Sequence, residues 1–169
     1  MHDFVRAGLI QTAAGNYYDP ADPGERQYAG NPPRRSITEE EIEILAVLAA
    51  GMDVLEIGTG LAVSTHALAS TARRVVTVDP DPWVQDPALP HVEFCRVLPH
   101  DLTGFDLVFI DGLHTREAVI NDIERSRPIA RLLLHDTYLP DVQAAIRHCA
   151  LVECTHWSTQ CRLAIYTRN

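Results

Sequence analysis

The sequence predicts an α/β domain with a doubly wound, mostly parallel, seven-stranded sheet. Short apolar runs alternate with stretches of helical periodicity from residue 38 onward. That order places helices on both faces of a parallel sheet. The length of 169 residues and the 46% hydrophobic content fit one globular domain. We therefore divide the chain into an N-terminal polar segment, 1–35, and a single domain, 36–169.

The N-terminal segment is rich in turn-forming residues, as at 19–24 and 31–33, which disfavours continuous regular structure. Two interpretations stay open for it. It is either a disordered tail or a lid that carries Tyr17, Tyr18 and Tyr28 over a pocket.

The elements of the domain follow from capping and periodicity. Thr38 and Glu41 have the spacing of a capping box, and Ile42, Leu45 and Ala49 form a helical stripe that Gly51 ends. Further helices are predicted at 61–71 and 115–126, and another begins at Pro140. Strands are predicted at 53–57, 74–79, 92–97, 106–111, 131–135, 151–155 and 161–167.

The links 80–91 and 98–105 are too short and too rich in Pro for full helices. One face of the sheet should therefore be thinly covered, which leaves room for a partner such as a second copy of the chain.

The charge and the cysteines limit the partners and the compartment. A net charge of -9 argues against a nucleic-acid surface. No apolar run approaches the roughly 20 residues that span a bilayer. The four cysteines include no C-x-x-C pair, so we expect free thiols and a cytoplasmic protein.

A glycine loop, Gly58-Thr59-Gly60, stands between the first strand and the next helix, where the backbone can approach a ligand closely. Asp79 ends the second strand, the position from which a carboxylate accepts ribose hydroxyls. A dinucleotide site would require a third glycine where this chain has Val63.

Two acid–histidine pairs follow later strands: Asp111 with His114, and His135 with Asp136. Because both lie at carboxyl ends of strands, they should meet at the edge that carries the glycine loop. Asp111 and Asp136 would offer oxygen ligands to Mg²⁺. His114 or His135 could accept a proton from a hydroxyl near neutral pH.

Segments 54–60 and 77–79 resemble the first two motifs of class I S-adenosylmethionine-dependent methyltransferases. The resemblance implies the Rossmann-like fold of that class, in a minimal version. It also implies S-adenosylmethionine as the cofactor. By position, the implied cofactor-binding residues are Glu56, Gly58, Thr59 and Gly60 in the loop, Asp79 at the ribose and Asp101 at the adenine amine.

Asp-Gly-Leu-His at 111–114 and His-Asp-Thr at 135–137 resemble the macrocin O-methyltransferase and cephalosporin hydroxylase group. This resemblance implies that Asp111 and Asp136 bind a metal and that His114 is the general base. We therefore expect methyl transfer to a hydroxyl of a small molecule, assisted by Mg²⁺. The shortened links, and the lack of a Pro-Gly-Gly turn before residue 131, favour an alternative: a non-catalytic binding or scaffold protein with the same fold.

Overall fold

The computed structural model describes residues 10–11, 17–18, 37–60, 62–80, 89, 91–157 and 163–168. Most of the N-terminal segment predicted over 1–35 lies outside these ranges. Within it, β1 (Ile10–Gln11) and β2 (Tyr17–Tyr18) form a small antiparallel pair.

A seven-stranded sheet forms the centre of the domain, with the strand order β5-β4-β3-β6-β7-β9-β8. β3, β4, β5, β6 and β7 pair in parallel, and β9 pairs antiparallel with both β7 and β8. The strands are β3 (Asp53–Ile57), β4 (Arg74–Val78), β5 (Val92–Cys95), β6 (Leu107–Ile110), β7 (Leu132–Leu134), β8 (Leu151–His156) and β9 (Ala164–Arg168). The predicted α/β fold class with a mostly parallel sheet is confirmed.

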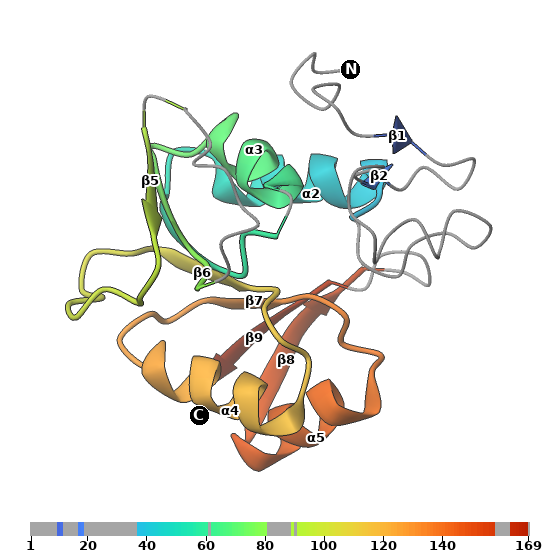
Figure 1. Ribbon diagram of the computed structural model, residues 1–169. Coiled ribbons are helices and arrows are strands. Elements are labelled where there is room, and N and C mark those ends of the chain that lie inside the picture. The colour runs from blue at the N-terminus through green and yellow to red at the C-terminus, as the bar shows by residue number, and fades with distance from the viewer. Residues whose placement is uncertain are drawn as a thin grey trace.

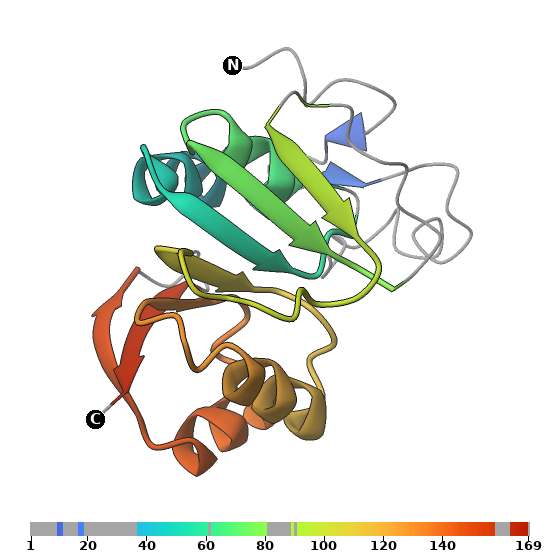
Figure 2. The same ribbon diagram turned by 90° about the vertical axis from the view of Figure 1, so that its left-hand side faces the viewer.

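Helices cover both faces of the sheet (Figures 1 and 2). α2 (Glu39–Ala49) and α3 (Val63–Ala69) lie on one face, and α4 (Arg116–Arg125) and α5 (Pro140–His148) lie on the other. The predicted capping box is present, because Thr38 Oγ1 accepts from Glu41 N and the Glu41 carboxylate accepts from Thr38 N. None of the helices in the described ranges is long and apolar enough to cross a membrane.

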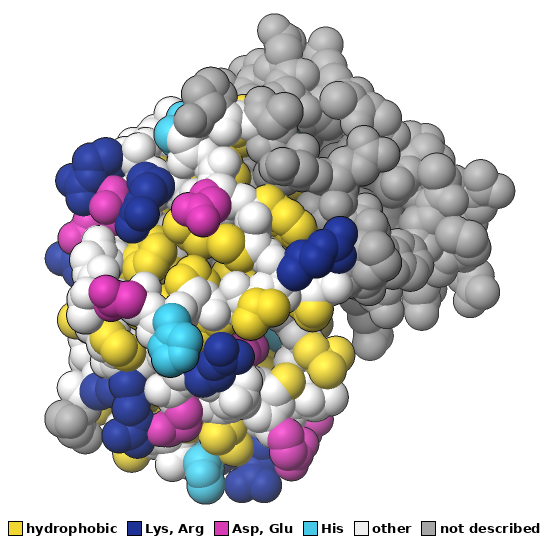
Figure 3. Space-filling model, turned by 60° about the vertical axis from the view of Figure 1, so that its left-hand side comes forward, with side chains coloured by type: hydrophobic (Ala, Val, Ile, Leu, Met, Phe, Trp, Pro, Cys, Tyr) yellow, Lys and Arg dark blue, Asp and Glu magenta, His cyan; other side chains and the backbone are white. Residues whose placement is uncertain are grey.

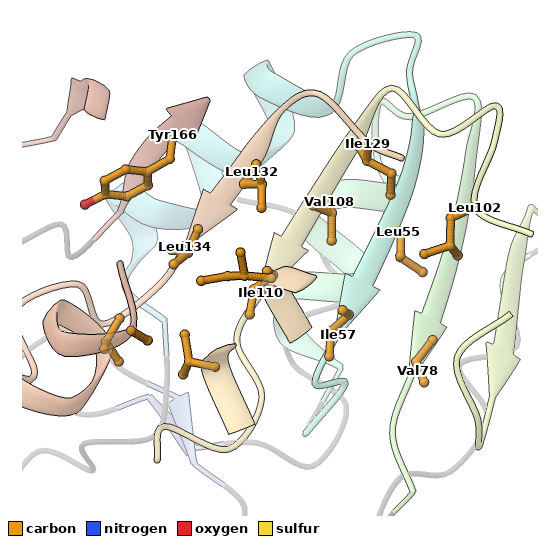
Figure 4. Close-up of a cluster of buried hydrophobic side chains, with 14 of the residues drawn as sticks. Leu55, Ile57, Val78, Leu102, Val108, Ile110, Ile129, Leu132, Leu134 and Tyr166 are labelled. Carbon is orange, nitrogen blue, oxygen red and sulfur yellow. The ribbon is translucent and has the colours of Figure 1, made fainter. Parts of the chain in front are cut away.

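Successive strand residues enter two separate apolar cores, as the two-residue period of a strand requires. Val54, Leu107 and Phe109 pack under α2 and α3. Leu55, Val108 and Ile110 point to the opposite face, towards α4 and α5 (Figure 4). Because both faces are covered, the central strands are apolar along nearly their whole length.

Several predicted elements are shorter in the structure. β5 ends at Cys95 rather than at 97 because its partner β4 ends at Val78, which pairs with Cys95. α3 begins at Val63 because Ala62 has a left-handed backbone, with φ of 60°. β9 begins at Ala164, and the first residues of the predicted strand 161–167 lie outside the described ranges.

The link between β5 and β6 contains no helix, as predicted. Leu98, Leu102 and Phe105 from this link pack onto the sheet face where a helix would lie. Val97 stays 72% exposed. On the side of the molecule that carries β5, apolar side chains gather between charged ones (Figure 3). The predicted partner for this face stays a prediction.

Gly58 joins the glycine loop to the end of β6. Its N–H donates to Val78 O at 2.9 Å, and Asp111 N donates to Ile57 O at 2.9 Å. With φ of +97°, a Cβ at Gly58 would lie 2.3 Å from the carbonyl oxygen of Asp111. Only glycine allows this approach between two main chains.

We expect Gly58→Ala to lower the free energy of unfolding by about 2–5 kcal/mol, since it adds a clash with rigid backbone to the left-handed strain. Gly104→Ala is the matched control: Gly104 has φ of +93°, but a Cβ there would meet nothing within 4 Å. It should cost only about 1–2 kcal/mol. Urea unfolding measures the free energy of unfolding of both variants, and so separates the clash with Asp111 from the left-handed strain that both share. Equal decreases in the two variants would contradict the contact assigned to Gly58.

Candidate active site

The glycine loop is tied to Asp79 at the carboxyl end of the neighbouring strand. Thr59 N and Gly60 N both donate to Asp79 Oδ2, at 3.1 and 3.0 Å. A Cβ built on Gly60 would meet nothing within 4 Å, so the loop has open space on that side. The sequence-predicted loop and acid therefore form one unit, although Asp79 lies nineteen residues beyond Gly60.

Hydrogen bonds between threonine hydroxyls connect the glycine loop to the buried carboxylate of Glu56. Thr77 Oγ1 donates to Glu56 Oε2 at 2.6 Å, and Thr65 Oγ1 donates to the same oxygen at 2.5 Å. Since Thr77 has one hydroxyl proton, the 2.6 Å contact between Thr59 Oγ1 and Thr77 Oγ1 must use the Thr59 proton. Glu56, Thr65 and Thr77 are all buried. The sequence alone did not mark Thr65 or Thr77 as site residues.

Burial raises the pKa of Glu56 to about 7, although hydroxyl groups of Ser64, Thr65 and Thr77 lower it in part. Its carboxylate is 0% exposed and lies beneath the loop, rather than on the open side at Gly60. Glu56 thus supports the loop from inside the core. Its predicted contact with a cofactor stays a prediction.

The two predicted acid–histidine pairs meet at the same edge of the sheet. β6 and β7 are parallel neighbours, so the residues that follow them lie side by side. His114 Nε2 lies 3.2 Å from Asp111 Oδ1 and 3.8 Å from Asp136 Oδ2. His135 Nδ1 lies 3.0 Å from Asp111 Oδ1. We call Asp111, His114, His135 and Asp136 the acid–histidine cluster.

Backbone conformation contributes to this arrangement. Asp136 has a left-handed backbone, with φ of 50°, two residues after β7 ends at Leu134. Asp tolerates this region better than most residues, and such strain often occurs at functional sites. The turn places His135 Nδ1 3.0 Å from Asp111 Oδ1 and Asp136 Oδ2 3.8 Å from His114 Nε2, although adjacent residues of an extended strand would point to opposite faces.

Glu41 of α2, predicted from the sequence only as a capping residue, contacts the cluster from the covering helix. Its Oε1 lies 3.4 Å from His135 Nε2, and its side chain is 2% exposed. The strand period explains the contact, because His135 follows Leu133 on the sheet face that α2 covers. A signal was present in the sequence, since Glu41 shares a helix face with Leu45, four residues on.

The charges in the cluster stabilise one another. Burial raises the pKa of Asp111, but the nearby His135 and His114 outweigh it and lower the value to about 2. Burial lowers the pKa of His135, whereas Asp111, Glu41 and Asp136 raise it well above its ordinary 6.5. Asp111 is therefore ionised and His135 is protonated at neutral pH when no other cation is near.

Both rings of the cluster contain buried nitrogens whose contacts lack the alignment of a hydrogen bond. They are His114 Nε2 and both ring nitrogens of His135, judged within the part of the chain that the structure describes. Asp111, His114 and His135 each offer one donor atom, and these atoms lie within 4.8 Å of one another. Such a group has the spacing of a metal-binding site.

The last residue predicted for the site, Asp101, makes its described hydrogen bonds within its own link. Asp101 is exposed in the link between β5 and β6, where its Oδ1 accepts from Thr103 N and Oγ1 at 2.8 and 2.7 Å. No described contact joins it to the loop or to the cluster, so its role at an adenine ring stays a prediction.

Comparison with known proteins identifies the fold. No family model matches the chain, and no curated protein matches its sequence. Among solved structures, cofactor-bound Rv0187 from MTB is 22% identical over 88% of this chain and 91% of its own, with a TM-score of 0.61. The O-methyltransferase TomG from Streptomyces achromogenes, in complex with SAM, is 15% identical over 98% and 94%, with a TM-score of 0.64.

An O-methyltransferase from Bacillus cereus in complex with SAH is 16% identical over 85% of this chain and 88% of its own, with a TM-score of 0.60. The chain therefore has the Rossmann-like fold of S-adenosylmethionine-dependent methyltransferases and resembles the O-methyltransferases among them. This confirms the fold that the motifs at 54–60 and 77–79 indicated.

Glu56→Gln should flatten the pH dependence of stability between pH 4.5 and pH 7. The folded-state pKa of about 7 exceeds the ordinary 4.5, so the folded protein binds the extra proton. Stability from this group is complete below 4.5 and is lost as the pH rises through 7, by about 3 kcal/mol. The amide of Gln does not titrate in this range, so the variant lacks this contribution. Urea unfolding from pH 4.5 to 8 measures this, and parallel curves for both proteins would refute the assignment.

Proposed function

We propose that this chain is an S-adenosylmethionine-dependent methyltransferase that methylates a hydroxyl group of a small molecule. One observation carries the proposal: Gly58 of the loop touches the main chain of Asp111. The loop, predicted to bind the methyl donor, and the cluster, predicted to hold the acceptor, are therefore immediate neighbours. A binding or scaffold protein would need no proton acceptor beside its ligand.

The residues fit the cofactor in two respects. Glycine at 58 and 60 keeps the loop close to β6 while leaving open space beside Gly60. Asp79 is held at the edge of the sheet by Thr59 N and Gly60 N. From there its carboxylate could accept hydrogen bonds from ribose hydroxyls. Val63 argues against a dinucleotide, since it stands where the third glycine would be.

S-adenosylmethionine supplies a methyl group on a positively charged sulfur. In the proposed reaction, His114 accepts the proton of the acceptor hydroxyl. The acceptor oxygen would then bond to the methyl carbon, and the electron pair of the broken carbon–sulfur bond would stay on sulfur. His114 suits the role because its side chain is 28% exposed, whereas that of His135 is only 6% exposed. Positioning of the two reactants would supply much of the rate.

A hollow of about 480 Å³ between α5 and the strands β8 and β9 begins beside the cluster at Thr137. Its volume falls in the range of small-molecule sites. An acceptor bound there would contact Thr137, which follows Asp136 in the chain, whereas Asp136 and His114 do not themselves line the hollow. The remaining lining residues are Tyr138, Gln143, Ile146, Arg147, Leu151, Glu153, His156 and Tyr166.

Asp79→Ala should weaken S-adenosylmethionine binding by about 1–3 kcal/mol, because charge-assisted hydrogen bonds to the ribose are lost. Wild-type affinity is expected in the micromolar range, about -8 kcal/mol. Isothermal calorimetry measures both, with Asp141→Ala, an exposed acid on α5, as the control. Wild-type protein that does not bind at millimolar cofactor would disprove the proposed function.

His114→Ala should lower turnover by about 10²–10⁴-fold, the usual contribution of a general base, and leave cofactor affinity nearly unchanged. Release of S-adenosylhomocysteine with a panel of phenols and sugars measures turnover. His148→Ala, at an exposed position on α5, is the control. Equal turnover of wild type and His114→Ala would remove His114 from the reaction.

A further inference from the structure

Charged side chains of both signs line the hollow between α5 and the strands β8 and β9. Arg147 comes from α5 and Glu153 comes from β8. Neither Asp136 nor His114 is among the described residues that line it, so the hollow is not the place of methyl transfer. Because it begins at Thr137, directly after Asp136, it can hold a second part of a molecule whose hydroxyl reaches the cluster.

A buried tyrosine fixes the carboxylate of Glu153 in the hollow. The hydroxyl of Tyr166 donates to Glu153 Oε2 at 3.1 Å, and in Figure 4 it points away from Leu134. Burial and the nearby Glu153 raise the pKa of Tyr166, so the hydroxyl keeps its proton and stays a donor at neutral pH. His156 Nδ1 lies 3.9 Å from the same carboxylate oxygen. Among the described residues, none donates a hydrogen bond to Glu153 Oε1, which can therefore accept one from a cationic ligand.

Arg147 supplies the opposite charge. It is exposed, and no carboxylate in the part of the chain that the structure describes lies within ion-pair distance of its guanidinium. Arg147 and Glu153 thus line one hollow without neutralising each other. A guanidinium is well suited to bind a carboxylate through two parallel hydrogen bonds. The hollow can therefore receive a ligand that carries both an ammonium and a carboxylate group.

Apolar side chains complete the lining. Ile146 and Leu151 line the hollow and also pack against the core under α4 and α5. Tyr138 lines it as well, two residues after Asp136, and is 46% exposed. Its ring offers a flat apolar surface on the loop that leads back to the cluster, which favours an aromatic ligand.

We propose that the hollow binds the head group of an amino acid, with Glu153 holding the ammonium group and Arg147 the carboxylate, and that the side-chain hydroxyl of this amino acid is the methyl acceptor. The inference rests on the proposed function and names the class of its substrate. L-Tyrosine is the probe, because it combines both charged groups with a hydroxyl on an aromatic ring.

The first test titrates ¹⁵N-labelled protein, without S-adenosylmethionine, with L-tyrosine and with two analogues that each lack one charged group. Tyramine lacks the carboxylate, and hydroxyphenylpropionate lacks the ammonium group. L-Tyrosine should bind with a dissociation constant of about 1 mM or less, within the usual range for substrates. Each analogue should bind about tenfold more weakly, because one charge-assisted interaction is lost. The amide signals that shift should belong to α5 and β8.

Two variants test the two charges separately. Glu153→Gln should weaken binding of L-tyrosine and tyramine about 10–100-fold and leave hydroxyphenylpropionate nearly unchanged. Arg147→Gln should weaken L-tyrosine and hydroxyphenylpropionate to a similar extent and leave tyramine nearly unchanged. Glu117→Gln and Arg125→Gln, at exposed positions on α4, are the matched controls and should bind all three probes like wild type.

The expected pattern differs from that of a structural defect, which would weaken all three probes together. Absence of L-tyrosine binding at millimolar concentration, equal affinity for the three probes, or variants that weaken all three alike would each overturn the inference. Release of S-adenosylhomocysteine from uncharged phenols as fast as from L-tyrosine would contradict the inference but not the proposed function. Protein that binds L-tyrosine as expected but does not bind S-adenosylmethionine would contradict the proposed function alone.

Discussion

The contact between Gly58 and the main chain of Asp111 is the constraint on which the site depends. It fixes how closely the end of β3 approaches the end of β6, because a Cβ at Gly58 would lie 2.3 Å from Asp111 O. Gly58 leads into the glycine loop, which binds Asp79. Asp111 belongs to the acid–histidine cluster. The close approach of the Gly58 and Asp111 main chains therefore positions both halves of the site relative to each other.

A line of polar side chains crosses the core on the α2 and α3 face, near the carboxyl edge of the sheet. Glu56, Thr77 and His135 occupy strand positions, or positions just past a strand, that elsewhere on this face carry apolar residues. Thr65 and Glu41 reach them from the covering helices. Buried polar groups are costly unless paired. The pairing therefore constrains how α2 and α3 sit on the sheet, in addition to apolar packing.

The ionisation of the buried acids differs between the two halves of the site. Glu56 lies in a buried environment that raises its pKa to about 7. Asp111 stays ionised because His135 and His114 are close. Negative charge is thus reduced beneath the glycine loop and retained at the cluster. The edge of the sheet can hold a positive group next to fixed carboxylates without opening the apolar core.

The sequence by itself determined the order of elements, the capping box at Thr38, the glycine loop with Asp79, and the two acid–histidine pairs. These features depend on local periodicity, on backbone conformation and on the rule that parallel strands share a carboxyl edge. Only the tertiary structure decided that Glu41 lies behind His135 and that Glu56 is held by Thr65 and Thr77. These contacts join residues on separate elements, whose meeting depends on how helices pack on the sheet. The tertiary structure also decided that β5 ends at Cys95, because a strand extends only as far as its neighbour can pair with it.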